Sequence, residues 1–291
     1  MIDFRYHAMS LAAVFVALAF GLLLGVTIGD SNLVSDFQGN LEKSLKQDVD
    51  SARQEAREAK AQVERQGEFI GSAYPRLVSG RLEGQRVATI GSADVAQLTL
   101  RSVNRAVDPA GADVEFVAQL VADPQYKQIA SALGASDLIK GEEPTAKEAD
   151  QLGRAVGRRI ARGRDATALR RFVFSRLSGD ITRVRLVAYA RQVPVPEDTK
   201  DASKVKPDAV YDGFERGVVA GLSQQVDRVA GVETSGTVPS NIEWYNSLGL
   251  STVDDIQDYS GYFSLVAIFD GAKGDFGGKD TADAVVPELS R

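Results

Sequence analysis

The side chains best suited to binding a transition metal are gathered at one end of this chain. The sequence contains one histidine, His7, two methionines, Met1 and Met9, and no cysteine. Imidazole and sulfur ligands form most transition-metal sites, so His7 and Met9 are the candidate metal ligands, and the rest of the chain offers a metal only oxygen atoms. The absence of cysteine also excludes a disulfide framework and a thiolate nucleophile.

Oxygen ligands are concentrated near the C-terminus in two carboxylate clusters. These are Asp254, Asp255 and Asp258, and then Asp270, Asp275 and Asp280. Carboxylates can bind Ca²⁺ or Mg²⁺, but neither cluster has the residue order of an EF-hand loop. Carboxylates in solvated loops are the simpler interpretation.

The common signatures of catalysis and of phosphate binding are missing. A Ser-His-Asp triad is excluded beyond the first residues, because His7 is the only histidine. The first predicted strand–helix turn, TIGSADVAQ, lacks GxGxxG, and GxxxxGK followed by Ser or Thr occurs nowhere. The net charge of −6 and the lack of a strongly basic domain exclude a nucleic-acid binder. We predict a protein that is not an enzyme and holds no cofactor; an enzyme whose sheet binds a sugar or nucleotide is the alternative.

The elements that must position these groups begin with an apolar segment. Between Arg5 and Asp30 there is no Asp, Glu, Lys or Arg. As a helix this stretch would be about 36 Å long, enough to cross a hydrocarbon core of about 30 Å. A buried core helix and a signal peptide cleaved after Ala17–Ala19 are the alternatives. Because the apolar run continues past Ala19, we predict an uncleaved membrane anchor over residues 1–30. The acidic residues that follow favour a cytoplasmic N-terminus, with the bulk of the chain extracytoplasmic.

Three glycines repeat at a spacing of four within this anchor. Gly21, Gly25 and Gly29 would lie on one helix face. In lipid, small residues let two helix backbones approach closely, so this face predicts self-association of two copies. The alternative is that glycine is simply common in membrane helices.

The next segment, residues 31–72, predicts a polar helical stalk. Apolar residues recur in steps of three and four, as on one helical face. The predicted seam is Leu41, Leu45, Val49, Ala52, Ala56, Ala59 and Val63. A stripe this narrow between faces of mixed charge is typical of a coiled coil, so we predict a parallel homodimer. The alternative is a single solvated helix.

From residue 73 to 271 the pattern predicts an α/β domain. We expect strands over 86–92, 112–121, 183–191, 231–235 and 250–254, and helices over 94–107, 125–133, 146–162, 166–177, 212–229 and 241–248. The run YFSLVAIF fits either a strand or a helix. Alternating strands and helices favour a mostly parallel, doubly wound sheet. Residues 272–291 are rich in Gly and Asp and predict a flexible tail.

Two stretches, one near each end, resemble the mycobacterial copper transport protein B (MctB) family, which includes the corynebacterial SteB proteins. They are the opening FRYHAMSLAAVFVALAFGLLLG and the block STVDDIQDYSGYFSLVAIFDGAKGDFG, Ser251–Gly277. The chain departs from the family pattern in having Asp-Tyr-Ser for the usual Thr-Pro-Ala and Phe276 for the usual tyrosine. The family-motif residues are Ser251, Thr252, Val253, Asp254 and Gly261.

The resemblance implies a single-pass cell-envelope protein of an actinobacterium that acts in copper transport or homeostasis, with copper as a transported ion. For the SteB branch it implies a non-enzymatic scaffold that partners a second membrane protein in septal cell-wall assembly during cell division. The residues themselves offer copper soft ligands only at His7 and Met9. One membrane helix also cannot enclose a pore without several copies. The resemblance therefore leaves two expected roles, one in copper transport and one as a septal scaffold.

Overall fold

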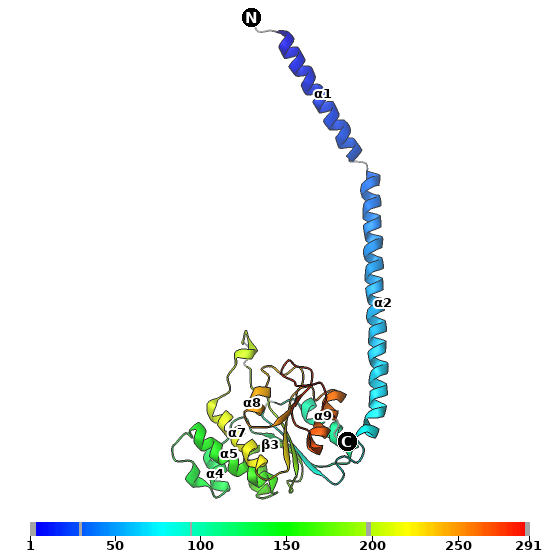
Figure 1. Ribbon diagram of the computed structural model, residues 1–291. Coiled ribbons are helices and arrows are strands. Elements are labelled where there is room, and N and C mark those ends of the chain that lie inside the picture. Colours follow the sequence, from blue (N-terminus) through cyan, green and yellow to red (C-terminus); the bar gives the residue numbers. More distant parts are fainter. Residues whose placement is uncertain (1–3, 29–30, 94, 196–198, 289–291) are drawn as a thin grey trace. The chain divides into compact units, whose positions relative to one another are not determined.

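The computed structural model describes residues 4–28, 31–93, 95–195 and 199–288. The chain divides into two compact units, Met1–Glu68 and Phe69–Arg291. As predicted, it is a mixed α/β chain with an N-terminal apolar helix, a long second helix and a mostly parallel sheet (Figure 1).

The first unit is helical. Helix α1 spans Phe4–Ile28, and within it Met9–Val26 has a mean hydropathy of 2.5 and no buried side chains. It is the one helix among the described residues that is long and apolar enough to cross a membrane. Helix α2 spans Ser31–Val78, and its described side chains from Lys43 to Glu68 are exposed or half-buried. The first unit therefore has no hydrophobic core of its own in these residues.

In the second unit, the described residues form one seven-stranded sheet in the order β3-β2-β1-β4-β5-β6-β7. Its strands are β1 (Arg86–Gly91), β2 (Asp113–Leu120), β3 (Phe174–Gly179), β4 (Leu186–Ala190), β5 (Arg228–Val232), β6 (Ser251–Val253) and β7 (Asp275–Phe276). Only the edge strand β3 runs antiparallel to its neighbour; the other pairs are parallel.

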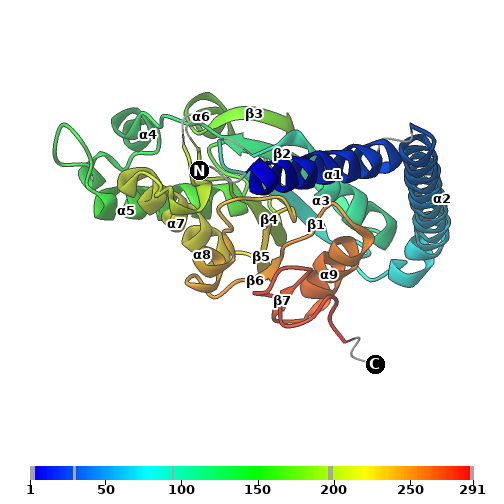
Figure 2. The ribbon, with the colours of Figure 1, turned by 90° about the horizontal axis from the view of Figure 1, so that it is seen from above.

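Helices cover both faces of this sheet (Figure 2). They are α3 (Gln97–Val107), α4 (Tyr126–Ala132), α5 (Ala146–Ala161), α6 (Ala166–Phe172), α7 (Ala209–Ser223), α8 (Ile242–Asn246) and α9 (Tyr259–Asp270). Ala88 and Ile90 of β1 belong to the core with α5 and α7, whereas Val87 belongs to the core with α3 and α9. This alternation follows the two-residue period of a strand.

Helices α5 and α7 touch backbone to backbone through glycines. A side chain at Gly153 of α5 would lie 2.8 Å from the Val218 nitrogen. A side chain at Gly217 of α7 would lie 2.8 Å from the Asp150 carbonyl carbon and overlap its oxygen. Only glycine fits at these two positions without moving the helices apart.

Two predicted helices ran into residues that form strands. The helix expected over 166–177 ends at Phe172, and Phe174–Gly179 pairs with β2 instead. The helix expected over 212–229 runs from Ala209 to Ser223, and β5 begins at Arg228 rather than at residue 231. In both places strand pairing, a long-range effect, prevails over local helix propensity. The ambiguous run YFSLVAIF is part of helix α9, and its periodicity is weak because most of its residues are buried.

The segment over residues 272–291, predicted as a flexible tail, contains strand β7 and the hydrogen-bonded Gly278 and Lys279. Its last three residues lie outside the described residues.

Candidate functional site

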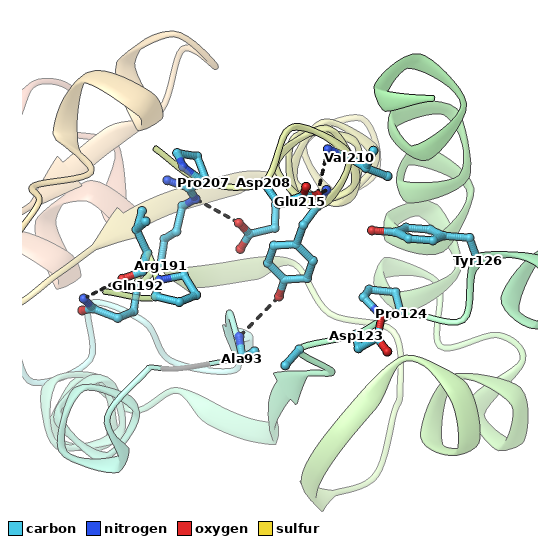
Figure 3. Close-up of a pocket in the computed structure, with 14 residues that line it drawn as sticks. Ala93, Asp123, Pro124, Tyr126, Arg191, Gln192, Pro207, Asp208, Val210 and Glu215 are labelled. Carbon is cyan, nitrogen blue, oxygen red and sulfur yellow. Dashed lines mark hydrogen bonds and ion pairs between the residues drawn. The ribbon is translucent and has the colours of Figure 1, made fainter. Parts of the chain in front are cut away.

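A cleft lies at the carboxyl ends of β1, β2 and β4 (Figure 3). Strand β1 pairs with β2 on one side and β4 on the other, so the order of the strands reverses between β1 and β4. In open α/β sheets this is where ligands bind. The cavity measures about 380 Å³, within the range of small-molecule sites. Its lining includes Ala93 after β1, Asp123 and Tyr126 after β2, Arg191 and Gln192 after β4, and Asp208 and Glu215 from the α7 region.

Arg191 lines the cleft, and all three of its guanidinium nitrogens are paired. They donate to Glu215 (3.0 Å), Asn241 (2.9 Å) and Asp212 (2.8 Å). The guanidinium also lies over the Trp244 ring, 4.5 Å from its centroid. Because its side chain is only 4% exposed, this network fixes the residue in one position.

Glu215 is the buried partner that balances Arg191. Its side chain is 2% exposed, and the Tyr189 hydroxyl donates to its other oxygen at 2.8 Å. Burial raises the pKa of Glu215, against the opposing effects of Arg191 and Tyr189. Burial acts to lower the pKa of Arg191, but the carboxylates of Glu215 and Asp212 outweigh it, and that pKa is raised. Glu215 and Arg191 therefore form a buried ion pair in which each charge compensates the other.

The walls of the cleft carry carboxylates and aromatic rings. Asp208 caps α7, because its carboxylate accepts from the backbone nitrogens of Val210 (3.0 Å) and Tyr211 (2.8 Å). Tyr126 faces Arg191 across the cavity (Figure 3). Burial raises the pKa of Tyr126, and the charges of Asp208 and Asp123 raise it further. With three carboxylates and one paired guanidinium, this lining suits a neutral or cationic polar ligand better than a phosphate.

A second polar cluster lies at the end of β6 and contains the family-motif residue Asp254. Asp254 is 1% exposed, and its carboxylate accepts from the backbone nitrogens of Gly278 (2.8 Å) and Lys279 (3.0 Å). The Lys279 ammonium donates to Glu233 at 2.5 Å and to the Thr237 carbonyl at 3.1 Å. This cluster ties the segment after β7 to the sheet.

The other motif residues support the same arrangement. Ser251, Thr252 and Val253 form β6, and the Thr252 hydroxyl donates to Asp275 at 2.7 Å. A side chain at Gly261 would lie 2.7 Å from the Asp255 carbonyl carbon. In this geometry the motif residues support the backbone of β6 and of the segments beside it.

Among the residues that the structure describes, those predicted for metal binding and self-association are not brought together by contacts. Met9 is 77% exposed, and the side chain of His7 lies outside the described residues. Nothing lies within 4 Å of a side chain built at Gly21 or Gly25, and Gly29 lies outside the described residues. In the part of the chain that the structure describes, no three His, Cys, Asp or Glu residues gather to hold a metal ion.

The predicted stalk seam faces solvent wherever its side chains are described. Leu45, Val49 and Val63 are 56%, 47% and 66% exposed. The seam residues Ala52, Ala56 and Ala59 are exposed as well, and the side chain of Leu41 lies outside the described residues.

Sequence reasoning missed the cleft and its Arg191–Glu215 pair. Two signals pointed to them. Arg191 directly follows the apolar strand LVAYA, and Glu215 interrupts the apolar face of the segment GFERGVVAGL. A charge in such surroundings needs a partner, but the sequence does not state which strands are neighbours.

The chain matches the family model described as "Copper transport outer membrane protein, MctB" over residues 1–287. Relatives called "Copper transporter MctB" from Mycobacterium bovis and Mycobacterium tuberculosis are 27% identical to it over 159 residues. The aligned stretch covers 53% of this chain and 50% of each relative, so the chain spans about half the length of the curated relatives it matches. These similarities confirm the resemblance inferred from the two sequence motifs. They lend no support to the septal SteB-like alternative.

Proposed function

The chain belongs to the MctB family of copper transport outer membrane proteins, and on that premise we propose that it acts in copper transport or homeostasis as a membrane-anchored envelope protein. The observation that carries the proposal is the extent of the match. Residues 1–287 include both the apolar helix and the α/β domain, so the family relationship covers the whole arrangement.

The proposed topology places one anchor in the bilayer. Helix α1 spans the membrane once, uncleaved, with its N-terminus in the cytoplasm and the doubly wound α/β domain outside. The apolar window Met9–Val26 supports a span by its length and hydropathy. The acidic residues that follow the helix support the orientation.

In this proposal the α/β domain does not itself coordinate copper. The soft ligands of the chain are confined to His7 and to the two methionines, all within the first nine residues. Copper is the transported ion and not a resident cofactor, and the domain is a binding module without enzymatic activity. The cleft beside Arg191 is its proposed point of contact with a ligand or a partner.

Pairing of two copies completes the proposal, because one membrane helix cannot enclose a path for an ion. Gly21, Gly25 and Gly29 supply the contact within the bilayer, and the stalk forms a parallel coiled coil above it. A second membrane protein as partner stays a prediction.

Copper tolerance of a deletion strain tests the function. We expect the strain to lose tolerance to copper but not to zinc, and the full-length gene to restore it. Unchanged copper tolerance would contradict the proposal. A second measurement tests whether the N-terminal residues bind the ion. It compares the copper content of the purified full-length protein with that of the double variant His7→Ala and Met9→Leu.

Charge reversal at the cleft tests the role of the α/β domain. Asp123→Lys places a cation at the cleft wall, and Asp137→Lys makes the same change at an exposed position that does not line the cavity. We expect Asp123→Lys to reduce copper tolerance in the complemented strain and Asp137→Lys to leave it intact. Equal tolerance of the two strains would remove the cleft from the proposal.

A further inference from the structure

An exposed apolar stripe on α2 follows a strict seven-residue repeat from Leu45 onward. Val49, Ala56 and Val63 recur at intervals of seven, and so do Leu45, Ala52 and Ala59. These two sets alternate in steps of three and four, as the a and d positions of a coiled coil do. All six side chains are exposed.

The same register continues in the sequence to the end of the helix, in the second unit. Ile70 and Leu77 fall on the a positions, and they are 42% and 57% exposed. Ala73 falls on a d position, and Gln66 is the one polar residue of the repeat. The repeat therefore extends beyond the predicted stalk boundary at residue 72.

The neighbouring face of this part of α2 is already used by the domain. Tyr74 and Val78 are 3% and 0% exposed, and the Tyr74 hydroxyl donates to the Ala106 carbonyl at 2.6 Å. Because these residues pack on their own domain, the open face of Ile70 and Leu77 is available to another chain.

The charges beside the stripe specify both the partner and its direction. Between Leu45 and Val63 the charged g positions are acidic, Asp48 and Glu55, and the charged e positions are basic, Lys46, Arg53 and Lys60. In a parallel, in-register pair, Asp48 faces Arg53 of the other copy and Glu55 faces Lys60, so opposite charges meet. In an antiparallel pair, e faces e and g faces g, so like charges would meet.

These basic residues are free to turn towards a partner. Within the described part of the chain, Arg53 and Lys60 make long contacts in their own helix, to Asp50 at 4.0 Å and to Glu64 at 3.9 Å. Exposed pairs of this length contribute little to stability.

We propose that a second copy of this chain covers the stripe from Leu45 to Leu77 as a parallel, in-register, two-stranded coiled coil. The inference deepens the parallel homodimer of the proposed function, on which it rests, by assigning the heptad register and by extending the contact to Leu77. It also assigns Ile70 and Leu77, which belong to the folded domain, to the contact between copies.

Engineered cysteines test the register, because the chain has no cysteine of its own. In a parallel, in-register pair each a position meets its own counterpart, within reach of a disulfide. We expect Ile70→Cys and Leu77→Cys, in the full-length protein diluted in detergent, to form covalent dimers about tenfold more than Ser72→Cys on mild oxidation. Ser72 is exposed and lies on the c position of the same turn, so it is the matched control. Equal crosslinking at the three positions, or none at Ile70 and Leu77, would overturn the proposal.

A charge exchange tests the direction independently of these substitutions. Glu55→Lys should reduce dimer formation about fivefold, because it faces Lys60 of the other copy. Adding Lys60→Glu should restore the dimer. No restoration would overturn the parallel arrangement. The crosslinking assay does not depend on copper. If the crosslinked dimer fails to form while copper tolerance stays intact, the coiled coil is rejected and the proposed role in copper transport still stands.

Discussion

Replacing Arg191 by methionine should destabilise the α/β domain by several kcal/mol. The substitution keeps the length of the side chain but removes hydrogen bonds to Glu215, Asn241 and Asp212. Asp212 keeps the hydrogen bond that the Trp244 indole donates to it at 2.8 Å. Glu215, whose side chain is 2% exposed, is left as a buried charge without its cation. Breaking a buried ion pair from one side costs about 3–5 kcal/mol, and we expect a loss of that size in the free energy of unfolding.

A second substitution separates the unpaired charge from the lost contacts. Glu215→Gln in the Arg191→Met background removes the charge and keeps an oxygen that can accept from Tyr189. We expect it to recover about 2 kcal/mol of the loss, because the cost of a buried unpaired charge exceeds that of a neutral amide. The double variant should therefore be more stable than Arg191→Met alone.

The pH dependence gives a further check on this pair. Without Arg191, burial raises the pKa of Glu215 further above its value in the unfolded chain. A carboxyl group with a raised folded-state pKa contributes its stability at low pH and loses it as the pH rises through that pKa. The deficit of Arg191→Met should therefore be larger at high pH than at low pH, and the Glu215→Gln variant should lack this difference.

The assay is urea unfolding of the full-length protein, followed by circular dichroism and by the fluorescence of Trp244, the only tryptophan. Circular dichroism is needed because Arg191 lies on the Trp244 ring, so its removal changes the fluorescence baseline. A loss below about 1 kcal/mol for Arg191→Met, or a double variant no more stable than it, would refute the reasoning.

Three further predictions concern glycine contacts and a buried carboxyl group. Gly217→Ala should lower the melting temperature, because the added methyl group overlaps α5. Such overpacking costs about 1–3 kcal/mol, which exceeds the gain of about 1 kcal/mol in helix propensity. The control Gly67→Ala should not lower the melting temperature, because nothing lies within 4 Å of a side chain built there. Burial raises the pKa of Asp255 from 3.8 to about 6, so stability should fall as the pH rises through that range. Asp255→Asn should abolish the fall in urea titrations, and a persisting fall would assign it to another group. Gly25→Ile should weaken crosslinking between membrane-embedded copies without releasing the chain, whereas unchanged crosslinking would reduce the glycine triplet to ordinary membrane-helix composition.

The sequence predicted the elements of this chain better than their contacts. The apolar helix, the long helix and the alternation of strands and helices follow from composition and local period, which the sequence contains directly. The cleft depends on β1 lying between β2 and β4, and this order is set by long-range packing. Arg191 could be recognised as a charge at a strand end, but its partner Glu215 is 24 residues away.

Glycine spacing is the clearest case in which a local sequence pattern does not predict a contact. Gly21 and Gly25, at a spacing of four in α1, have nothing within 4 Å. Gly213 and Gly217, at the same spacing in α7, make backbone contact with α5. The pattern allows a close approach between helices, but only the fold determines whether a second helix is present.

The contact between Lys279 and Glu233 has a consequence for how the domain is completed during synthesis. Glu233 has no exposed side-chain surface, and Lys279 is the cation that compensates it, at 2.5 Å. Lys279 leaves the ribosome after all seven described strands, so an emerging chain contains the buried carboxylate before it contains its partner. A domain interrupted before Lys279 lacks this cation, and burying the Glu233 carboxylate without it costs free energy. Arrival of this one lysine therefore distinguishes the finished domain from an interrupted one.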